Sequence, residues 1–219
     1  MAHAFDIHNE LGRLPSEKIF KDELAYRCKS DAMNAWREMP IRVSHDDFTK
    51  SYYIDLVVNS GVIYELKVAK HIAGEHERQL IHYLLLLGQH HGNVINFRSA
   101  SVEKRFVSTS LTIAERRIFT LNCQDFLATD DLSARLETVI RNILNDWGAF
   151  LEIALYREAV HHFLGGEENL AQSVELRDND RIVGRQPMRL LNPTTSLHLS
   201  AVGGIKAFRR PRKTPSPAP

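Results

Sequence analysis

The chain has 219 residues, and its 28 lysine and arginine residues almost balance 27 aspartate and glutamate residues, for a formal net charge of +1. With 43% hydrophobic residues it can form a real core, whereas the balanced charge means that any binding to nucleic acid must come from a local patch. Its two cysteines, Cys28 and Cys123, exclude a disulfide framework and indicate free thiols in a reducing compartment.

The chain has no segment typical of export or of a membrane span. Its start, MAHAFDIHNELG, lacks the basic residues and the apolar run of a signal peptide. No stretch approaches the roughly 20 apolar residues that cross a bilayer. We therefore expect a soluble, cytoplasmic protein with no membrane partner.

The first 110 residues alternate helix and strand patterns and form the first predicted domain. A helix is predicted from Ser16 to Cys28, continuing to about Trp36 before Met39-Pro40 breaks it. A turn at Asn59-Ser60-Gly61 separates two apolar strands, which predicts a hairpin. A helix closed by Gly88 and two further strands follow. The order predicts an α/β (α+β) fold with a mixed sheet flanked by helices. The predicted strands cover residues 41–43, 52–58, 62–68, 94–97 and 104–107, and the second helix covers residues 74–87.

Residues 111–202 form the second predicted segment, helical and then α/β. An amphipathic helix is expected over residues 131–147 and another helix over residues 149–164, ended by Gly165-Gly166. Strands are predicted at Ser173–Arg177 and Leu197–Val202. Two interpretations stay open: an inactive, degenerate repeat of residues 10–68, or an unrelated extension. Residues 203–219 are basic and proline-rich, and form either a solvated disordered tail or a phosphate-binding one.

Two predicted neighbouring strands carry the residues that indicate chemistry. Glu65 and Lys67 lie two apart and therefore share one face of their strand. Asp55 lies on the partner strand among apolar residues, where a carboxylate is costly to bury without a partner. A divalent cation suits two converging carboxylates, since Mg²⁺ needs only one or two of them and keeps several waters. The alternative is a cross-strand salt bridge on a solvated sheet face.

Two helices offer further candidate residues. Gln79 and Tyr83 are four apart and share one helical face, with His76 one turn earlier. Glu17 in the first helix is a further candidate ligand, and His8 is a weaker one. The alternative for each of these residues is an ordinary surface or structural role.

Taken together, these residues and their spacing resemble a known family. Residues 8–107 resemble the GxxExxY proteins, a family of the PD-(D/E)XK nuclease superfamily. That resemblance implies a restriction-endonuclease-like fold. The segments that carry it are His8-Asn9-Glu10-Leu11-Gly12, Glu17, Asp55-Leu56-Val57-Val58, Val62-Ile63-Tyr64-Glu65-Leu66-Lys67, His76, Gln79-Leu80-Ile81-His82-Tyr83, Asn93-Val94-Ile95-Asn96-Phe97 and Lys104-Arg105.

The resemblance also implies roles for the residues. Asp55 and Glu65 would bind Mg²⁺ or Mn²⁺, Glu17 would complete the metal site, and Lys67 would be the catalytic lysine. Gln79 and Tyr83 resemble the glutamine-x-x-x-tyrosine motif of helicase-associated exonucleases, where the helix lines the active site and positions the substrate.

The signature that names the family is altered in this chain. Leu14 stands in place of its glycine and Phe20 in place of its tyrosine, while the glutamate remains as Glu17. The first change affects the entry to the helix, and the second removes a hydroxyl group. Neither change removes a proposed metal ligand.

Three hypotheses follow for the function. The first is a metal-dependent nuclease that hydrolyses phosphodiester bonds in nucleic acid, with DNA as the expected partner. The second is a catalytically weak nucleic-acid-binding or adaptor module on the same fold. The third is a scaffold with an internal salt bridge. For the assembly, we expect either packing of the two halves within one chain or a homodimer.

Overall fold

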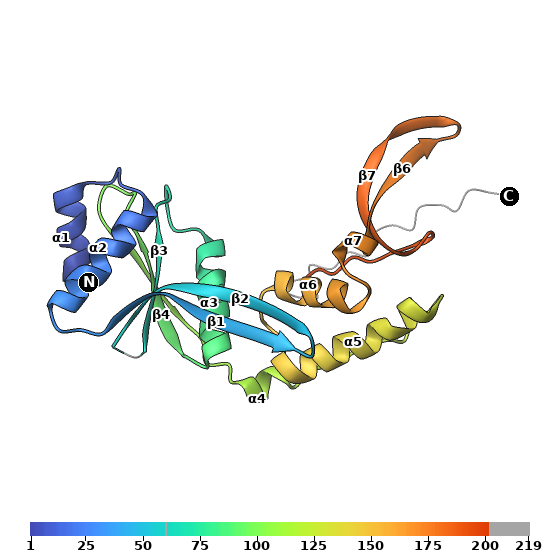
Figure 1. Cartoon of the computed structure of the whole chain (residues 1–219), viewed down its shortest axis with the longest axis horizontal. Coiled ribbons are helices and arrows are strands. Elements are labelled where there is room, and N and C mark those ends of the chain that lie inside the picture. Colours follow the sequence, from blue (N-terminus) through green and yellow to red (C-terminus); the bar gives the residue numbers. More distant parts are fainter. Residues whose placement is uncertain (60, 202–219) are drawn as a thin grey trace.

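The computed structural model describes residues 1–59 and 61–201. Its N-terminal part is a five-stranded sheet with helices on both faces (Figure 1). The strand order is β1-β2-β3-β4-β5, in which β3 and β4 are parallel and the other neighbours antiparallel. This mixed sheet confirms the predicted fold class. The elements are α1 (Ala2–Leu11), α2 (Glu17–Ser30), β1 (Ala35–His45), β2 (Phe48–Val58), β3 (Val62–Lys67), α3 (Gly74–Leu87), β4 (His91–Asn96) and β5 (Glu103–Ser108).

Each face of this sheet buries its own apolar cluster. Helices α1 and α2 cover one face and α3 covers the other. Each fully buried aliphatic or phenylalanine side chain stabilises the fold by about 1.5–3 kcal/mol. Because α2 and α3 cover opposite faces of the sheet, the side chains of β2 and β3 lie between these two helices. The first cluster includes Ile7, Phe20, Leu24, Leu56 and Leu66, and the second includes Ile54, Ile63, Leu80, Leu84 and Val94.

Strand β2 is distorted at Asp55. The β1–β2 register pairs Leu56 and Ile54 with residues of β1 but pairs neither Asp55 nor the opposite Glu38. Glu38 has a positive φ of 48°, a conformation that non-glycine residues rarely adopt. Ile54 and Leu56, two apart, pack in opposite clusters, although such residues normally share a face of a strand. Asp55 therefore lies at the position where the side chains of β2 change from one face of the sheet to the other.

Two predictions for the start of the chain are wrong. Helix α2 ends at Ser30, and β1 begins at Ala35 rather than after a helix reaching Trp36. Pro40 does not break the chain but lies within β1. Since β1 is an edge strand and Pro40 is exposed, its missing N–H leaves no ladder partner unpaired. Helix α1 was not predicted.

Other local predictions in this part are confirmed. Strands β2 and β3 form the predicted antiparallel hairpin, although Ser60 of its turn lies outside the described residues. Helix α3 spans the predicted residues and ends at Gly88, whose φ of 63° is the left-handed conformation of a helix C-cap.

The C-terminal part consists of helices followed by a separate, small sheet. The amphipathic helix over residues 131–147 is confirmed as α5, and the next helix as α6, shorter than predicted. The strand predicted at Leu197–Val202 is wrong for its described residues 197–201, which form no strand. The antiparallel sheet instead has the order β6-β7-β8. The elements are α4 (Ile113–Arg116), α5 (Asp131–Trp147), α6 (Ile153–Phe163), α7 (Glu167–Leu170), β6 (Ala171–Asp178), β7 (Arg181–Asn192) and β8 (Thr195–Ser196).

Two predictions for the C-terminal part are not tested by the structure. The resemblance of residues 145–202 to residues 10–68 stays a prediction. The predicted tail, residues 203–219, lies outside the described residues. Across residues 1–59 and 61–201, no helix has the length and apolar character that a bilayer crossing requires.

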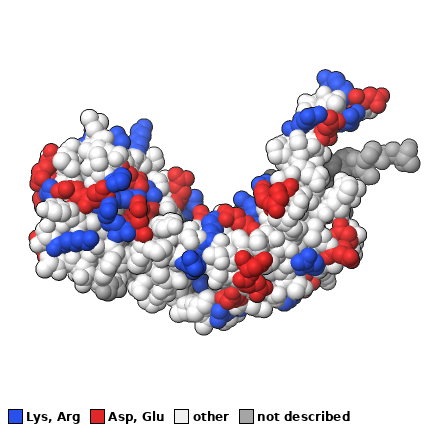
Figure 2. Space-filling view, viewed as in Figure 1, with Lys and Arg blue, Asp and Glu red and all other residues white. Residues whose placement is uncertain are grey.

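The two parts pack against each other through a third apolar cluster. Val43, Phe48 and Leu85 of the first part join residues of α5 and α6 in it. Polar contacts cross the same junction: the indole N–H of Trp147 donates to the Ser44 carbonyl at 2.9 Å. In the space-filling view the outline is concave between the sheet and the β6–β7 hairpin, and charges of both signs are intermixed on either side (Figure 2).

Candidate active site

Asp55 projects from the distorted part of β2 into a mostly buried position, with 7% of the residue exposed. Its Oδ2 accepts a hydrogen bond from the backbone N–H of Leu66 at 2.8 Å. Its Oδ1 lies 2.5 Å from the Lys21 ammonium nitrogen. The β2–β3 ladder pairs residues only as far as Leu56 and Tyr64. The Asp55 side chain therefore satisfies a backbone donor of β3 beyond the paired part of the ladder.

Glu65 is the most deeply buried charged group of the site, with 1% of the residue exposed. Its Oε1 accepts a hydrogen bond from the Lys67 ammonium at 2.6 Å, because the two residues share one face of β3. Its Oε2 is buried and has no hydrogen-bond partner among the described residues. Burial, and next the charge of Asp55, raise the pKa of Glu65 to about 7, although Lys67 acts in the opposite direction.

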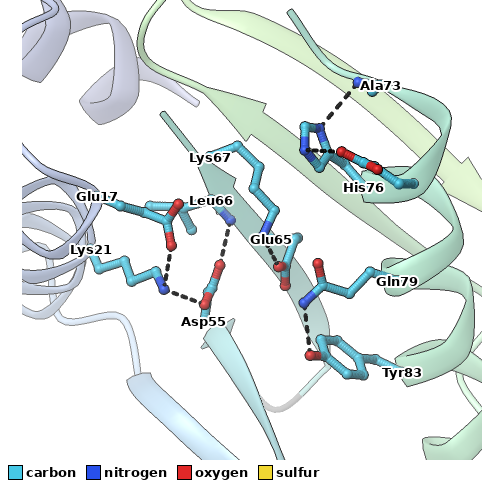
Figure 3. A network of polar contacts seen from close by, with 11 residues as sticks. Glu17, Lys21, Asp55, Glu65, Leu66, Lys67, Ala73, His76, Gln79 and Tyr83 are labelled. Carbon is cyan, nitrogen blue, oxygen red and sulfur yellow. Dashed lines mark hydrogen bonds and ion pairs between the residues drawn. The ribbon is translucent and has the colours of Figure 1, made fainter. Parts of the chain in front are cut away.

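Lys21 is the residue of this site that the sequence analysis missed. Its ammonium nitrogen lies 2.8 Å from Glu17 Oε1 and 2.5 Å from Asp55 Oδ1 (Figure 3). Burial alone would lower the pKa of Lys21, but its hydrogen bonds to Asp55 and Glu17 outweigh burial and raise it. The available signal was its spacing of four residues from Glu17 on a predicted helix. That signal places Lys21 beside Glu17 but says nothing about Asp55.

The candidate residues of α3 divide into two groups. Gln79 and Tyr83 face the carboxylates from α3, and the Gln79 amide donates to the Tyr83 hydroxyl at 2.9 Å (Figure 3). Burial raises the pKa of Tyr83, and the negative charges of Glu65 and Asp55 add to this effect. His76 instead caps α3, since its Nδ1 accepts from the Ala73 N–H at 3.1 Å.

His8, the weakest candidate, contacts the backbone of Ser99. Its Nε2 lies 3.0 Å from the carbonyl oxygen of Ser99, and the residue is buried. Because that carbonyl can only accept, the Nε2–H of His8 donates. His8 therefore joins α1 to the loop after β4.

Asp55 and Glu65 come from adjacent strands, and α2 and α3 enclose them from opposite sides (Figure 3). Three carboxylates, those of Glu17, Asp55 and Glu65, meet two ammonium groups, those of Lys21 and Lys67. When all five groups are ionised, one negative charge remains in excess. The site therefore favours an additional cation.

The donor set fits a hard divalent cation of the size of Mg²⁺. Glu65 Oε2 offers a buried oxygen without a partner, and Asp55 lies beside it. Within residues 1–59 and 61–201, no group of three or more histidine, cysteine, aspartate or glutamate side chains could hold a metal. Mg²⁺ needs only one or two protein carboxylates, because water and substrate phosphate complete its coordination. Glu17 is separated from this pair by the ammonium group of Lys21.

Two of the comparisons with known proteins carry no argument about this chain. No curated protein matches the chain. Among solved structures, the chain is similar to the one described as "Crystal structure of SSO0001", at 18% sequence identity over 44% of this chain and 52% of that chain, with a TM-score of 0.35. The chain thus spans about half the length of that structure, and so remote a likeness carries no argument.

The family comparison is specific to the N-terminal part. The model of the PD-(D/E)XK nuclease superfamily matches residues 1–107, which include the sheet and the whole candidate site. Membership of the GxxExxY family within that superfamily stays a prediction. Residues 1–107 of this chain form a domain that belongs to the PD-(D/E)XK nuclease superfamily.

Proposed function

We propose that this protein is a Mg²⁺- or Mn²⁺-dependent nuclease that hydrolyses phosphodiester bonds in DNA. The observation that carries the proposal is the buried, unpartnered Oε2 of Glu65 beside the carboxylate of Asp55. An unsatisfied buried oxygen of this kind is expensive unless a ligand completes its bonding. The superfamily of residues 1–107 supports the chemistry.

Asp55 and Glu65 would hold the metal. When bound, it polarises a phosphoryl oxygen and supports attack by water at neutral pH. Glu17, whose Oε1 lies 2.8 Å from the Lys21 ammonium nitrogen, would complete the metal site from α2 if the metal displaced that ammonium group. The chain's own side chains supply the remaining parts of the reaction.

Lys67, Gln79 and Tyr83 act on the substrate in this proposal. The Lys67 ammonium, which donates to Glu65 at 2.6 Å, would stabilise negative charge that develops on the scissile phosphate. Gln79 and Tyr83 line the opposite side through their mutual hydrogen bond and would position the substrate backbone. The burial of Tyr83 keeps its hydroxyl protonated and therefore able to donate.

Asp55→Asn tests the proposal, because the amide keeps the size of the side chain but loses its charge. We expect Mg²⁺-stimulated cleavage of DNA to fall on the order of 10²–10³-fold, as when a catalytic electrostatic group is lost. Asp146→Asn is the matched control, since Asp146 is an exposed aspartate that pairs with His45 far from the site. Wild-type protein that cleaves neither single- nor double-stranded nucleic acid with Mg²⁺ or Mn²⁺ would remove the enzymatic proposal.

A second candidate function rests on the Lys21 contact. Lys21 already neutralises Asp55 at 2.5 Å, so the carboxylates could serve as an internal ion-pair network in a nucleic-acid-binding or adaptor module. Calorimetric titration with Mg²⁺ separates the two proposals. A nuclease binds the ion and loses this binding on Asp55→Asn, whereas an adaptor held together by Lys21 shows no Mg²⁺ binding in either form.

The domain organisation is part of the proposal. Residues 1–110 would be the nuclease-like domain, residues 111–202 an extension that adds nucleic-acid-binding surface, and residues 203–219 a basic tail. A degenerate repeat remains one origin for the extension, and an unrelated addition the other.

A further inference from the structure

A cavity of about 430 Å³ lies in the C-terminal part, between α6 and the base of the β6–β7 hairpin. Figure 1 shows that α6, α7 and β7 lie close together in the C-terminal part. This volume lies within the range of small-molecule sites. The lining comes from Arg157 and His161 of α6, from residues 186–189 of β7, and from residues 196–199.

The lining is basic and apolar. It includes Arg157, Arg189, His161 and His198, and none of the described lining residues is an aspartate or glutamate. The apolar part of the lining consists of Pro187, Met188, Leu197 and Leu199. A cavity with guanidinium and imidazole groups but no carboxylate favours an anionic ligand that also has an apolar or aromatic part.

His161 is the buried polar group that points to a ligand. Only 4% of the residue is exposed, and its Nδ1 lies 2.6 Å from Glu167 Oε2. Arg189 donates to the same carboxylate at 2.5 Å and lowers the pKa of Glu167, which keeps it an acceptor. The Nδ1–H of His161 must therefore be the donor. Its Nε2 has no hydrogen-bond partner within the described chain, although the residue lines the cavity.

Arg157 supplies the positive charge of the cavity. Its Nη2 donates to the carbonyl oxygen of Leu199 at 3.1 Å. Within residues 1–59 and 61–201, Arg157 forms this hydrogen bond and no ion pair with a carboxylate, so most of its five N–H donors are available to a ligand. Arg189, by contrast, is neutralised by Glu167. The net charge offered to a ligand therefore comes mainly from Arg157.

We propose that this cavity binds the terminal phosphate of a nucleotide, with Arg157 and His161 as the phosphate ligands. A terminal phosphomonoester has a second ionisation near pH 6 and carries about 1.5–2 negative charges at pH 7, whereas an internal diester carries one. Arg157 matches a phosphate through its planar array of donors. His161 Nε2 accepts from a protonated phosphate oxygen or, as imidazolium, donates to an ionised one.

The apolar wall accounts for the rest of the ligand. Met188, Leu197 and Leu199 would face a sugar or a base rather than a second charged group. The choice of a nucleotide among phosphate esters rests on the proposed nuclease function, whose substrates and products carry such ends. The same phosphate can belong to a free mononucleotide or to the end of a strand.

The experiment measures binding by the full-length protein in a metal chelator, so that no cleavage occurs. A fluorescent single-stranded oligodeoxynucleotide is compared with and without a 5′-phosphate, each by polarisation titration. We expect the phosphorylated probe to bind about 10-fold more tightly, which corresponds to roughly 1.4 kcal/mol. Arg157→Gln should remove this difference, and Arg157→Lys should retain part of it.

Arg135→Gln is the matched control, because Arg135, like Arg157, donates from Nη2 to a backbone carbonyl at 3.1 Å, in this case that of Phe163. It does not line the cavity. A preference for the phosphorylated probe that survives Arg157→Gln would overturn the proposal, as would equal binding of both probes to wild type. Asp55→Asn should leave the preference unchanged, so failure of the nuclease proposal and failure of this one are distinguishable.

Competition distinguishes the sources of the phosphate. Adenosine 5′-monophosphate that displaces the probe at lower concentration than adenosine or inorganic phosphate supports a nucleotide site that also accepts the free form. Displacement by an unlabelled phosphorylated strand alone supports a strand-end site. Equal displacement by inorganic phosphate and adenosine 5′-monophosphate would overturn the nucleotide assignment.

Discussion

The candidate active site and the C-terminal cavity each contain a buried polar residue that an oppositely charged side chain binds at one atom only, and the two residues differ in the sign of their charge. In the first, Lys67 holds one oxygen of buried Glu65 and leaves Oε2 without a partner. In the second, Glu167 holds Nδ1 of His161, and Nε2, which is not among the fully buried atoms without a partner, has no hydrogen bond within the described residues of a chain in which His161 lines the cavity. A polar group that is only half hydrogen-bonded needs an explanation, and a ligand that completes the bonding is one such explanation. The acidic site thus suits a cation, and the basic cavity suits an anion.

Arg116 is a third buried group with unpaired polar atoms, but it has no suitable ligand site beside it. Arg116 is 3% exposed, and its Nε and Nη1 have no partner in residues 1–59 and 61–201. The atoms are covered by protein, and the pocket beside Arg116 also contains the carboxylate of Asp146. We therefore interpret Arg116 as an unfavourable charge at the junction of the two parts. The following predictions test this division, from the largest effect to the smallest.

Lys67→Met should have the largest effect, because it removes the cation that holds Glu65. We expect DNA cleavage to fall on the order of 10²-fold or more. We also expect the free energy of unfolding to fall by roughly 3 kcal/mol at pH 8, since a buried carboxylate loses its partner. The loss should be smaller at pH 6, because the pKa of Glu65 lies near 7 even with Lys67 present and protonation removes the charge. Urea unfolding and a cleavage assay measure the two effects.

Lys50→Met provides the comparison for that variant. Lys50 lies 2.5 Å from Glu158 across the junction, but the Glu158 side chain is 51% exposed. Exposed ion pairs typically contribute less than about 1 kcal/mol. If Lys50→Met destabilised the protein as much as Lys67→Met, the distinction between a buried, half-satisfied site and an ordinary surface pair would fail.

The parts of these two sites that were predictable from sequence are those set by local geometry. Strand alternation places Glu65 and Lys67 on one face, and helical spacing places Gln79 beside Tyr83. The hairpin brings Asp55 near Glu65, since its turn and apolar strands are encoded within a few residues. The fold class follows from the order of these patterns.

The missed parts depend on contacts between distant residues. Lys21 reaches Asp55 because α2 packs on the face of the sheet where β2 twists, and no local pattern encodes that twist. The cavity lining combines α6 with β7, a long strand that was not predicted because Gly184 and Pro187 interrupt its pattern. Likewise, Glu167 and Arg189 are 22 residues apart but share one ion pair.

His82 should make stability depend on pH at the junction of the two parts. It is buried, and its Nδ1 accepts a hydrogen bond from the Glu152 N–H at 3.1 Å. Burial lowers the pKa of His82 to about 4 from the usual 6.5, so the folded state binds fewer protons than the unfolded state between these values. Stability from His82 is therefore complete above pH 6.5 and is lost as the pH falls towards 4, by about 3 kcal/mol in total.

The test compares wild type with His82→Asn in unfolding experiments across that pH range. Asn keeps a hydrogen-bond acceptor but does not titrate, so its curve should lack the His82 contribution. Glu65 acts with the opposite sign, because its raised pKa gives stability that is lost as the pH rises through 7. Glu65 is common to both proteins, so the difference between the curves isolates His82. Parallel curves would contradict a neutral, buried His82.

Lys21→Met tests whether the Lys21 ammonium competes with Mg²⁺ at the candidate active site. Lys21 competes with a metal for Asp55, since its ammonium lies 2.5 Å from Oδ1. Removing a positive charge at this distance should tighten Mg²⁺ binding by about 10-fold, roughly 1.4 kcal/mol. Calorimetric titration measures the affinity, and Lys18→Met is the control, because Lys18 pairs with Asp22 on the exposed side of α2. Weaker Mg²⁺ binding by Lys21→Met would show that Lys21 supports the metal site instead.

Arg116→Met should stabilise the protein, which is the opposite sign from every other variant at a buried charge. The methionine keeps much of the apolar stem, whose Cβ lies near Gly148, and removes a guanidinium with two unsatisfied donors. Replacing buried charges with apolar residues of similar size stabilises proteins by about 1–4 kcal/mol in favourable cases, and we expect roughly 1 kcal/mol here because Arg116 also loses packing. Urea unfolding at pH 7 measures the change. A loss of stability would mean that the guanidinium has a partner that is essential to the junction, and would place Arg116 with Glu65 and His161 as a group that a ligand completes.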